Sequence, residues 1–261
     1  MAHKTTIDGT GYTISGGKTL LEGTSYAISG GQTMIDGTKR SISFQIPVGQ
    51  LPVNASVFFH VDGVAREFIV VNQGTPSVHG RGNYYVGANG TWLLQKEIYE
   101  DVAFDQTGRN YQQADIQSNL SNFQTRLDAT VRNALMEVRV PFEKMFSGML
   151  SLLKGNDGCV QKVFLLSEGE LDTPQQSIST NGDSVSAFYQ AANSARVAYK
   201  DGVPCRWWLR GAVNLSSKEA TYVDTDGTFG RSQCILPMST SLGFRPAFVL
   251  PFNFIVKEYL I

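Results

Sequence analysis

The chain has 261 residues, of which 42% are hydrophobic and 11% aromatic, enough to build a substantial buried core. Its 22 basic and 23 acidic residues leave a formal net charge of -1, so there is no basic field to hold nucleic acid by neutralising phosphates. No apolar run approaches the roughly 20 residues needed to cross a membrane, and the N-terminus lacks the apolar stretch of a signal peptide. We therefore expect folding in a reducing cytoplasm, with no nucleic-acid partner and no membrane insertion.

Residues 1–44 carry a short repeat with a period of 14 residues. It is clearest at Ile7, Leu21 and Ile35, and a glycine recurs two positions after each of them. Every unit holds two runs of alternating apolar and polar residues separated by glycine-bearing turns, a pattern typical of β-strands. Such a unit cannot bury its apolar residues alone. We predict an extended β arm that attaches to other subunits or multimerises, with a flexible Gly/Ser/Thr tether as the alternative.

From residue 45 onward, short alternating runs predict paired strands. Residues 56–61 and 65–71 are predicted strands, and Asp62-Gly63 between them is a favoured two-residue hairpin turn. Residues 91–99 are predicted to form a buried strand or a short helix. The C-terminal third is predicted to be a meander of short strands.

Two segments have the spacing of helices. Between Asn119 and Val138, apolar residues recur every three or four positions, which predicts one amphipathic helix. Residues 184–199 are a second predicted helix. Together with the strands, these helices predict an α+β domain with one core over residues 45–261.

Side chains that could carry catalysis or bind a metal are scattered. The three histidines lie far apart, and none has a second ligand at metal-binding spacing. Cys159, Cys205 and Cys234 fit no zinc spacing, so we expect free thiols, with a Cys205–Cys234 bridge as the alternative. No catalytic or nucleotide-binding motif is present. We therefore expect no enzyme activity, no metal and no cofactor.

The tryptophan pair Trp207 and Trp208 invites a stacking function, but a structural role is favoured. Adjacent residues of a strand point to opposite faces, so one ring can enter the core while the other caps it. Arg210 and Arg245 are interpreted as arginines at the edge of the core that satisfy backbone carbonyls or aromatic faces.

Asp224 and Asp226 superficially resemble a calcium loop. The following positions supply few oxygen ligands and no bidentate Glu, so a hairpin turn is the preferred interpretation. A second acidic run is interpreted as a solvated edge; it consists of Glu168, Glu170 and Asp172.

Three motifs in the last third occur in a recognisable order. They read Arg-Trp-Trp-Leu-Arg at residues 206–210, Tyr-Val-Asp-Thr-Asp-Gly at 222–227 and Gly-Phe-Arg-Pro-Ala-Phe at 243–248. The set resembles a domain of unknown function common in phage and bacterial proteins, whose usual endings read WWLRSP, YVDSDG and GVRPA. With earlier matching stretches, the resemblance covers about residues 55–250. Gly211 stands where that family usually has Ser, and the following Pro is missing, which affects the local turn more than the fold.

The endings are also similar to the C-type-lectin-like fold of formylglycine-generating enzymes and of variable phage receptor-binding proteins. The resemblance implies a C-type-lectin-like domain over residues 45–261, so the expected fold class is α+β, with the extended β-repeat arm over residues 1–44 ahead of it. Its implied structural motif consists of Trp207, Trp208, Arg210, Asp224, Asp226, Arg245 and Pro246.

The arm is similar to repeats in structural proteins of tailed phages, often placed ahead of this same domain. We therefore predict a tailed-phage virion protein, made in the bacterial host cytoplasm and displayed on the particle for host-surface recognition. The arm would bind other virion proteins, and the chain would form a homo-oligomer. A purely architectural role, as a capsid decoration or a tail or baseplate accessory, is the alternative. A formylglycine-generating type of oxidase is a remote one, since neither Cys205 nor Cys234 lies in a matching motif.

In lectin-like folds of this type, ligands usually meet the segments between the Trp-Arg motif and the final Arg-Pro motif. A surface there could bind a host glycan or protein by hydrogen bonding and stacking. Ordinary surface, or a contact between virion subunits, is the equal alternative. The predicted binding residues are Asn214, Ser216, Lys218, Glu219, Phe229, Arg231 and Gln233.

Overall fold

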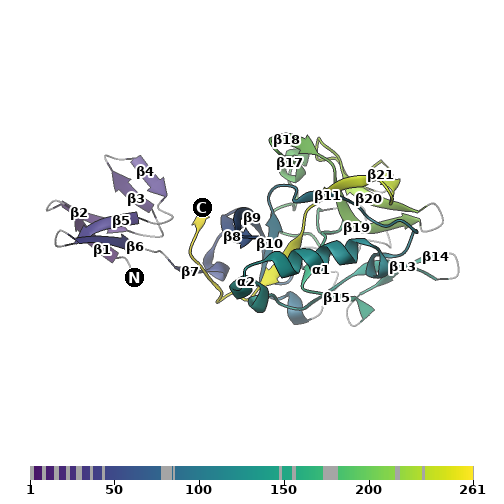
Figure 1. Ribbon diagram of the computed structural model, residues 1–261, viewed down its shortest axis with the longest axis horizontal. Coiled ribbons are helices and arrows are strands. Elements are labelled where there is room, and N and C mark those ends of the chain that lie inside the picture. The colour runs from purple at the N-terminus through teal and green to yellow at the C-terminus, as the bar shows by residue number, and fades with distance from the viewer. Residues whose placement is uncertain are drawn as a thin grey trace.

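The structure is a computed structural model of the whole chain (Figure 1). It describes residues 3–7, 10–14, 18–21, 24–27, 31–35, 38–42, 45–77, 84, 86–146, 149–154, 157–172, 182–214, 218–230 and 233–260. In this part of the chain no helix is long and apolar enough to cross a membrane.

The arm consists of three antiparallel hairpins, grouped at the N-terminal end of the chain in Figure 1. They pair β1 (His3–Ile7) with β2 (Thr10–Ile14), β3 (Lys18–Leu21) with β4 (Thr24–Ala27), and β5 (Gly31–Ile35) with β6 (Thr38–Ile42). Their registers repeat with the sequence, since Ile7 faces Thr10, Leu21 faces Thr24 and Ile35 faces Thr38. One 14-residue unit is therefore one hairpin, as the alternation predicts.

A six-stranded antiparallel sheet forms the centre of the body. Its strand order is β16 (Val163–Phe164), β23 (Ala247–Leu250), β10 (Thr91–Gln95), β9 (Val64–Gln73), β8 (Ser56–Val61) and β25 (Tyr259–Leu260). Every residue of β10 and β23 is buried, so both faces of the sheet are covered at these strands. The β8–β9 turn forms as predicted, because Asp62 and Gly63 adopt the two positive φ angles, 53° and 74°, that such a turn needs.

A five-stranded sheet carries the tryptophan motif. Its order is β11 (Glu100–Ala103), β22 (Ser241–Phe244), β19 (Trp207–Asn214), β20 (Glu219–Val223) and β21 (Ile235–Pro237). Four two-stranded sheets complete the body. They pair β12 (Val138–Val140) with β15 (Cys159–Gln161), β13 (Phe142–Phe146) with β14 (Met149–Leu153), β17 (Ala198–Lys200) with β18 (Val203–Cys205), and β24 (Ile255–Val256) with β7 (Ile46–Pro47).

The predicted helix over residues 119–138 is wrong in its extent. The structure has α1 (Ile116–Arg126) and α2 (Ala129–Ala134) instead. Between them the chain is extended at Leu127, which forms a bridge with Val61, and the amide of Asp128 donates to the carbonyl of His60. Pairing with β8 therefore interrupts the helical spacing.

The predicted helix over residues 184–199 is also wrong. That segment is a series of turns, with a 3-10 turn at Asn193–Arg196 followed by β17. Gln190 has φ of 53°, which an α-helix does not allow. The buried guanidinium of Arg196 donates to the carbonyls of Phe188 and Ala191, so these backbone groups find a side-chain partner instead of a helical one.

The expected α+β, C-type-lectin-like fold class is contradicted. Strands account for 40% of the chain and helical segments for 17%, and several antiparallel sheets dominate the body. The physical reason is that only α1 combines helical spacing with enough length, whereas most apolar runs are short and bounded by turns. Each of these runs satisfies its backbone by pairing with another strand.

Candidate binding groove

The residues of the tryptophan motif are part of the core. Trp207 and Trp208 are both fully buried on opposite sides of β19, so the expectation that one ring would only cap the core is wrong. Trp207 Nε1 donates to the Arg196 carbonyl at 3.1 Å, and Trp208 Nε1 donates to the Val102 carbonyl at 2.9 Å. Neither indole is therefore accessible for stacking on a ligand.

Arg210 is buried deeper than the core edge predicted for it. Its guanidinium forms a fully buried ion pair with Glu170, with Nη2 2.5 Å from Oε1. It also donates to the carbonyls of Pro141 and Leu165, and Tyr84 donates its hydroxyl to Glu170 Oε1 at 2.6 Å. Burial lowers the pKa of Arg210, but the charge and hydrogen bonds of Glu170 outweigh this and raise the pKa above its usual value.

The acidic run is a correction to the sequence interpretation. Glu168 and Glu170 are 4% and 0% exposed, so they do not form a solvated edge. Burial raises the pKa of Glu168 to about 7. Asp172 is half-buried and accepts the Ser184 hydroxyl at 2.7 Å.

Asp224 and Asp226 shape a turn, as the sequence favours. Asp224 accepts Arg206 Nε at 2.9 Å, and Asp226 accepts the Thr228 amide at 2.8 Å. Gly227 has φ of 82°, and a Cβ there would lie 1.9 Å from the Asn193 carbonyl oxygen, so only glycine fits. Among the described residues no group of three His, Cys, Asp or Glu side chains gathers as metal ligands would.

Arg245 and Pro246 lie in the tight connection between β22 and β23. Arg245 is 2% exposed, so it too is deeper than the core edge predicted for it. Its Nε donates to the Gln95 carbonyl at 2.8 Å, and its guanidinium lies 4.8 Å from the Trp207 ring centre. The Pro246 carbonyl accepts the backbone N–H of Gln95 at 3.0 Å, so this motif is hydrogen-bonded to the end of β10.

The predicted binding residues do not converge on one site. Lys218 and Glu219 lie where β20 begins, opposite Asn214 of β19, whereas Phe229 bridges to Val223 at the other end of β20. A five-residue strand separates the two groups by about 13 Å.

Two of these side chains contact other parts of the body. Phe229 is covered by the Arg196 guanidinium, 4.7 Å from its ring centre, and the side chain of Lys218 lies over Gly108. Gln233, four residues after Phe229, is exposed, and its backbone N–H donates to the Gly230 carbonyl. Ser216 and Arg231 lie outside the described residues.

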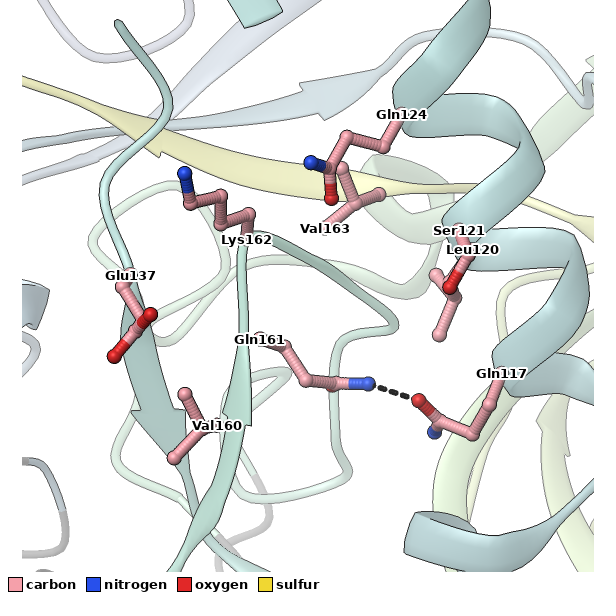
Figure 2. A pocket seen from close by; sticks show the side chains of 9 residues that line it. All are labelled: Gln117, Leu120, Ser121, Gln124, Glu137, Val160, Gln161, Lys162 and Val163. Carbon is pink, nitrogen blue, oxygen red and sulfur yellow. Dashed lines mark hydrogen bonds between the residues drawn. The ribbon is translucent and has the colours of Figure 1, made fainter. Parts of the chain in front are cut away.

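A polar groove of about 280 Å³ lies between α1 and β15 (Figure 2). The apolar stripe of α1 turns inward, with Ile116, Leu120 and Phe123 buried. Positions spaced by three or four share one helix face, so Gln117, Ser121 and Gln124 line the groove together. The opposite side is lined by residues 160–163 and Glu137.

Two amides in the groove are fixed by a hydrogen-bonded chain from the core. The buried hydroxyl of Tyr111 donates to Gln161 Oε1 at 2.8 Å, and Gln161 Nε2 donates to Gln117 Oε1, the dashed line in Figure 2. Gln117 Nε2 in turn donates to the Tyr111 carbonyl at 2.7 Å. Each amide therefore has a fixed orientation and keeps one N–H for a ligand.

The remaining polar groups of the groove carry opposite charges or none. Lys162 and Glu137 supply one cation and one anion, and Ser121 and Gln124 add a hydroxyl and an amide. For these four side chains the described part of the chain shows no hydrogen bond or ion pair. Gly87 lets the Glu137 backbone approach, since a Cβ there would lie 1.8 Å from the Glu137 carbonyl oxygen.

Sequence reasoning missed this groove. The spacing of Gln117, Ser121 and Gln124 was a readable signal for a polar helix face. The wall formed by Val160, Gln161 and Lys162 had no such signal, because it meets the helix only through tertiary folding.

Comparison with known proteins gives a family without a known function. A family model described as "Domain of unknown function (DUF6273)" matches residues 89–252, which include all three C-terminal motifs and both walls of the groove. Searches of the curated proteins and of the solved structures return no match.

Proposed function

The chain belongs to the DUF6273 family, and we propose that it is a structural protein of a tailed-phage particle, assembled through its arm and displaying its body for host-surface recognition. The observation that carries the proposal is that each sequence repeat of the arm is one hairpin with the same register. The resemblance of these repeats to those of phage structural proteins supports the placement on a phage particle.

The arm is suited to pairing with other chains. Each hairpin is a separate two-stranded sheet among the described residues, and an isolated two-stranded hairpin is only marginally stable in water. Its outer edges carry backbone donors and acceptors that can extend a sheet in a partner. Repetition of one register provides the same edge three times, which favours an ordered multimer over a loose tether.

Three large apolar side chains near the C-terminus of the chain are exposed on the surface of the body. Phe252, Ile255 and Leu260 are 39%, 43% and 44% exposed, although large apolar side chains are usually covered. Ile255 faces Pro47 in the β24–β7 pair, a few residues after the arm ends. Subunits brought together by their arms would cover this surface, which supports a homo-oligomer.

Two of the three cysteines have properties that favour a binding protein over an oxidase. Cys159 and Cys234 are buried and Cys205 is half-buried, and all three are free thiols, so the Cys205–Cys234 bridge does not form in this structure. Burial raises the pKa of Cys159 to about 11 and also raises that of Cys234. Thiols that stay protonated are poor nucleophiles and poor redox groups.

Deletion of residues 1–44 tests the proposal. We expect a body that keeps the thermal midpoint of the full chain but loses oligomerisation and incorporation into particles, measured by light scattering and by its abundance in purified virions. A control chain carries an arm of the same composition in shuffled order. If the shuffled arm assembles as well as the natural one, the arm is a tether and the proposal fails.

The architectural alternative predicts the same assembly defect. It differs in adsorption, since particles that carry the protein and particles that lack it would bind host cells equally. Reduced adsorption of particles lacking the protein supports recognition.

A further inference from the structure

We propose that the groove between α1 and β15 binds a neutral pyranose unit of a surface polysaccharide. This inference rests on the proposed function, because it assigns a ligand class to the displayed body. The site differs from the binding residues that the sequence predicts within positions 214–233, and its support comes from three properties of the groove.

The first property is size. At about 280 Å³, the groove lies at the lower limit of the roughly 300–1,000 Å³ that holds drug-sized ligands. One sugar ring fits this space, with neighbouring units of the polymer extending into solvent. Leu120 and Val163 are 2% and 3% exposed and form an apolar base for the C–H groups of such a ring.

The second property is the type and rigidity of the polar groups. Three amides and one hydroxyl line the groove, and amides present a donor beside an acceptor, which matches neighbouring sugar hydroxyls. Gln161 is 8% exposed and is fixed between Tyr111 and Gln117, so its free N–H is oriented before any ligand arrives. Preorganised groups lose little conformational entropy on binding.

The third property is charge. Lys162 and Glu137 cancel, so the groove has no net charge to select an anion or a cation. No aromatic ring lines the groove among the residues that the structure describes, so these residues do not supply the stacking that strengthens many sugar sites. We therefore expect millimolar affinity for a single sugar, which corresponds to about -4 kcal/mol. An oligomer held by the arms would raise the avidity of the particle by about 10²–10⁴.

An extended peptide is the competing ligand, because β15 has only β12 as a strand partner in the described part of the chain. However, β15 spans only Cys159–Gln161, so an added strand would gain few main-chain hydrogen bonds. The density of fixed side-chain amides favours the sugar.

The experiment is saturation-transfer NMR on the full chain with methyl glycosides of glucose, galactose, mannose, rhamnose and N-acetylglucosamine, together with glucuronic acid and a Thr/Val-rich hexapeptide. We expect transfer to at least one neutral glycoside and little to the acid. The variants S121A and Q124A should each weaken that binding at least fivefold. N122A, an exposed position on the same helix outside the groove, is the matched control and should bind as the natural chain does.

Three outcomes overturn the inference. They are no transfer to any neutral glycoside, binding by S121A and Q124A that is as strong as binding by the natural chain, or selective binding of the peptide. The proposed function is tested separately, by entry of the full chain into particles, and the arm-deleted body shows whether the site binds without assembly. If that body binds the glycoside but the full chain never enters particles, the proposed function fails and the site stands. If the full chain enters particles but binds no glycoside, only the site fails.

Discussion

Two fully buried arginines of the body are stabilised in different ways. Arg210, on β19, is paired with Glu170, whereas Arg245, between β22 and β23, donates to the Gln95 carbonyl and lies over the face of Trp207. The pKa of Arg210 is raised by its carboxylate partner, while burial lowers the pKa of Arg245 to about 9. The comparison shows that one core holds a charge either by pairing it or by surrounding it with polarisable and dipolar groups.

The largest expected effect comes from breaking the Arg210 pair. Glu170→Ala leaves a fully buried guanidinium without its carboxylate, and removal of one partner of a buried pair typically costs about 3–5 kcal/mol. We expect a loss of this size in the free energy of unfolding, measured by urea denaturation. Glu137→Ala, at an exposed position, is the control and should leave the midpoint unchanged. A loss below about 1 kcal/mol would mean that the carbonyls of Pro141 and Leu165 suffice for Arg210.

The sequence could predict elements that depend on neighbouring residues. The Asp62-Gly63 turn and the hairpin repeat of the arm are of this kind, because their geometry is set by residues within a few positions. The break at Leu127 was not predictable, because it depends on a bridge to Val61 far away in the chain. The periodicity that predicts a helix contains no information about such a partner.

The candidate site shows the same limit. One wall of the groove is a helix face whose polar spacing can be read from the sequence, but Tyr111 and Gln161 reach it from elsewhere in the chain. Conversely, residues 214–233 are close in sequence, and the length of β20 separates their side chains. Trp207 and Arg245, for which the sequence favours structural roles, are 0% and 2% exposed, but the depth of Arg245 could not be read from the sequence because arginines usually stay at the surface.

A smaller effect, which depends on pH, is expected at Glu168, two residues before Glu170. Burial raises its folded-state pKa to about 7, above the ordinary 4.5, so the folded state retains a proton that the unfolded state loses. Its contribution to stability is therefore greatest below pH 4.5 and falls as the pH rises to about 7. At 1.36 kcal/mol per pH unit, the fall amounts to about 3 kcal/mol.

Glu168→Gln removes this ionisation. We expect the variant to lose the decline between pH 4.5 and 7, and to be more stable than the natural chain at pH 8 by up to about 3 kcal/mol, less any hydrogen bond that the amide cannot replace. Urea denaturation across this pH range measures both quantities. Glu137→Gln serves as the exposed control. Parallel pH profiles for the natural chain and Glu168→Gln would show that Glu168 ionises in the folded protein as it does in water.

The smallest effect is expected at Arg245. Arg245→Met removes one hydrogen bond to the Gln95 carbonyl and the contact with Trp207. It also removes a buried charge, and it leaves no carboxylate without its ion-pair partner. These terms nearly cancel, so we expect a loss of about 1 kcal/mol in the free energy of unfolding, at least 2 kcal/mol smaller than that of Glu170→Ala. Arg245→Lys should be worse than Arg245→Met, because an ammonium keeps the charge without the planar group that lies over the indole. If Arg245→Met lowers the free energy of unfolding as much as Glu170→Ala does, the core does not compensate the two arginines differently. Arg245 would then depend on an interaction stronger than those with the Gln95 carbonyl and the Trp207 ring.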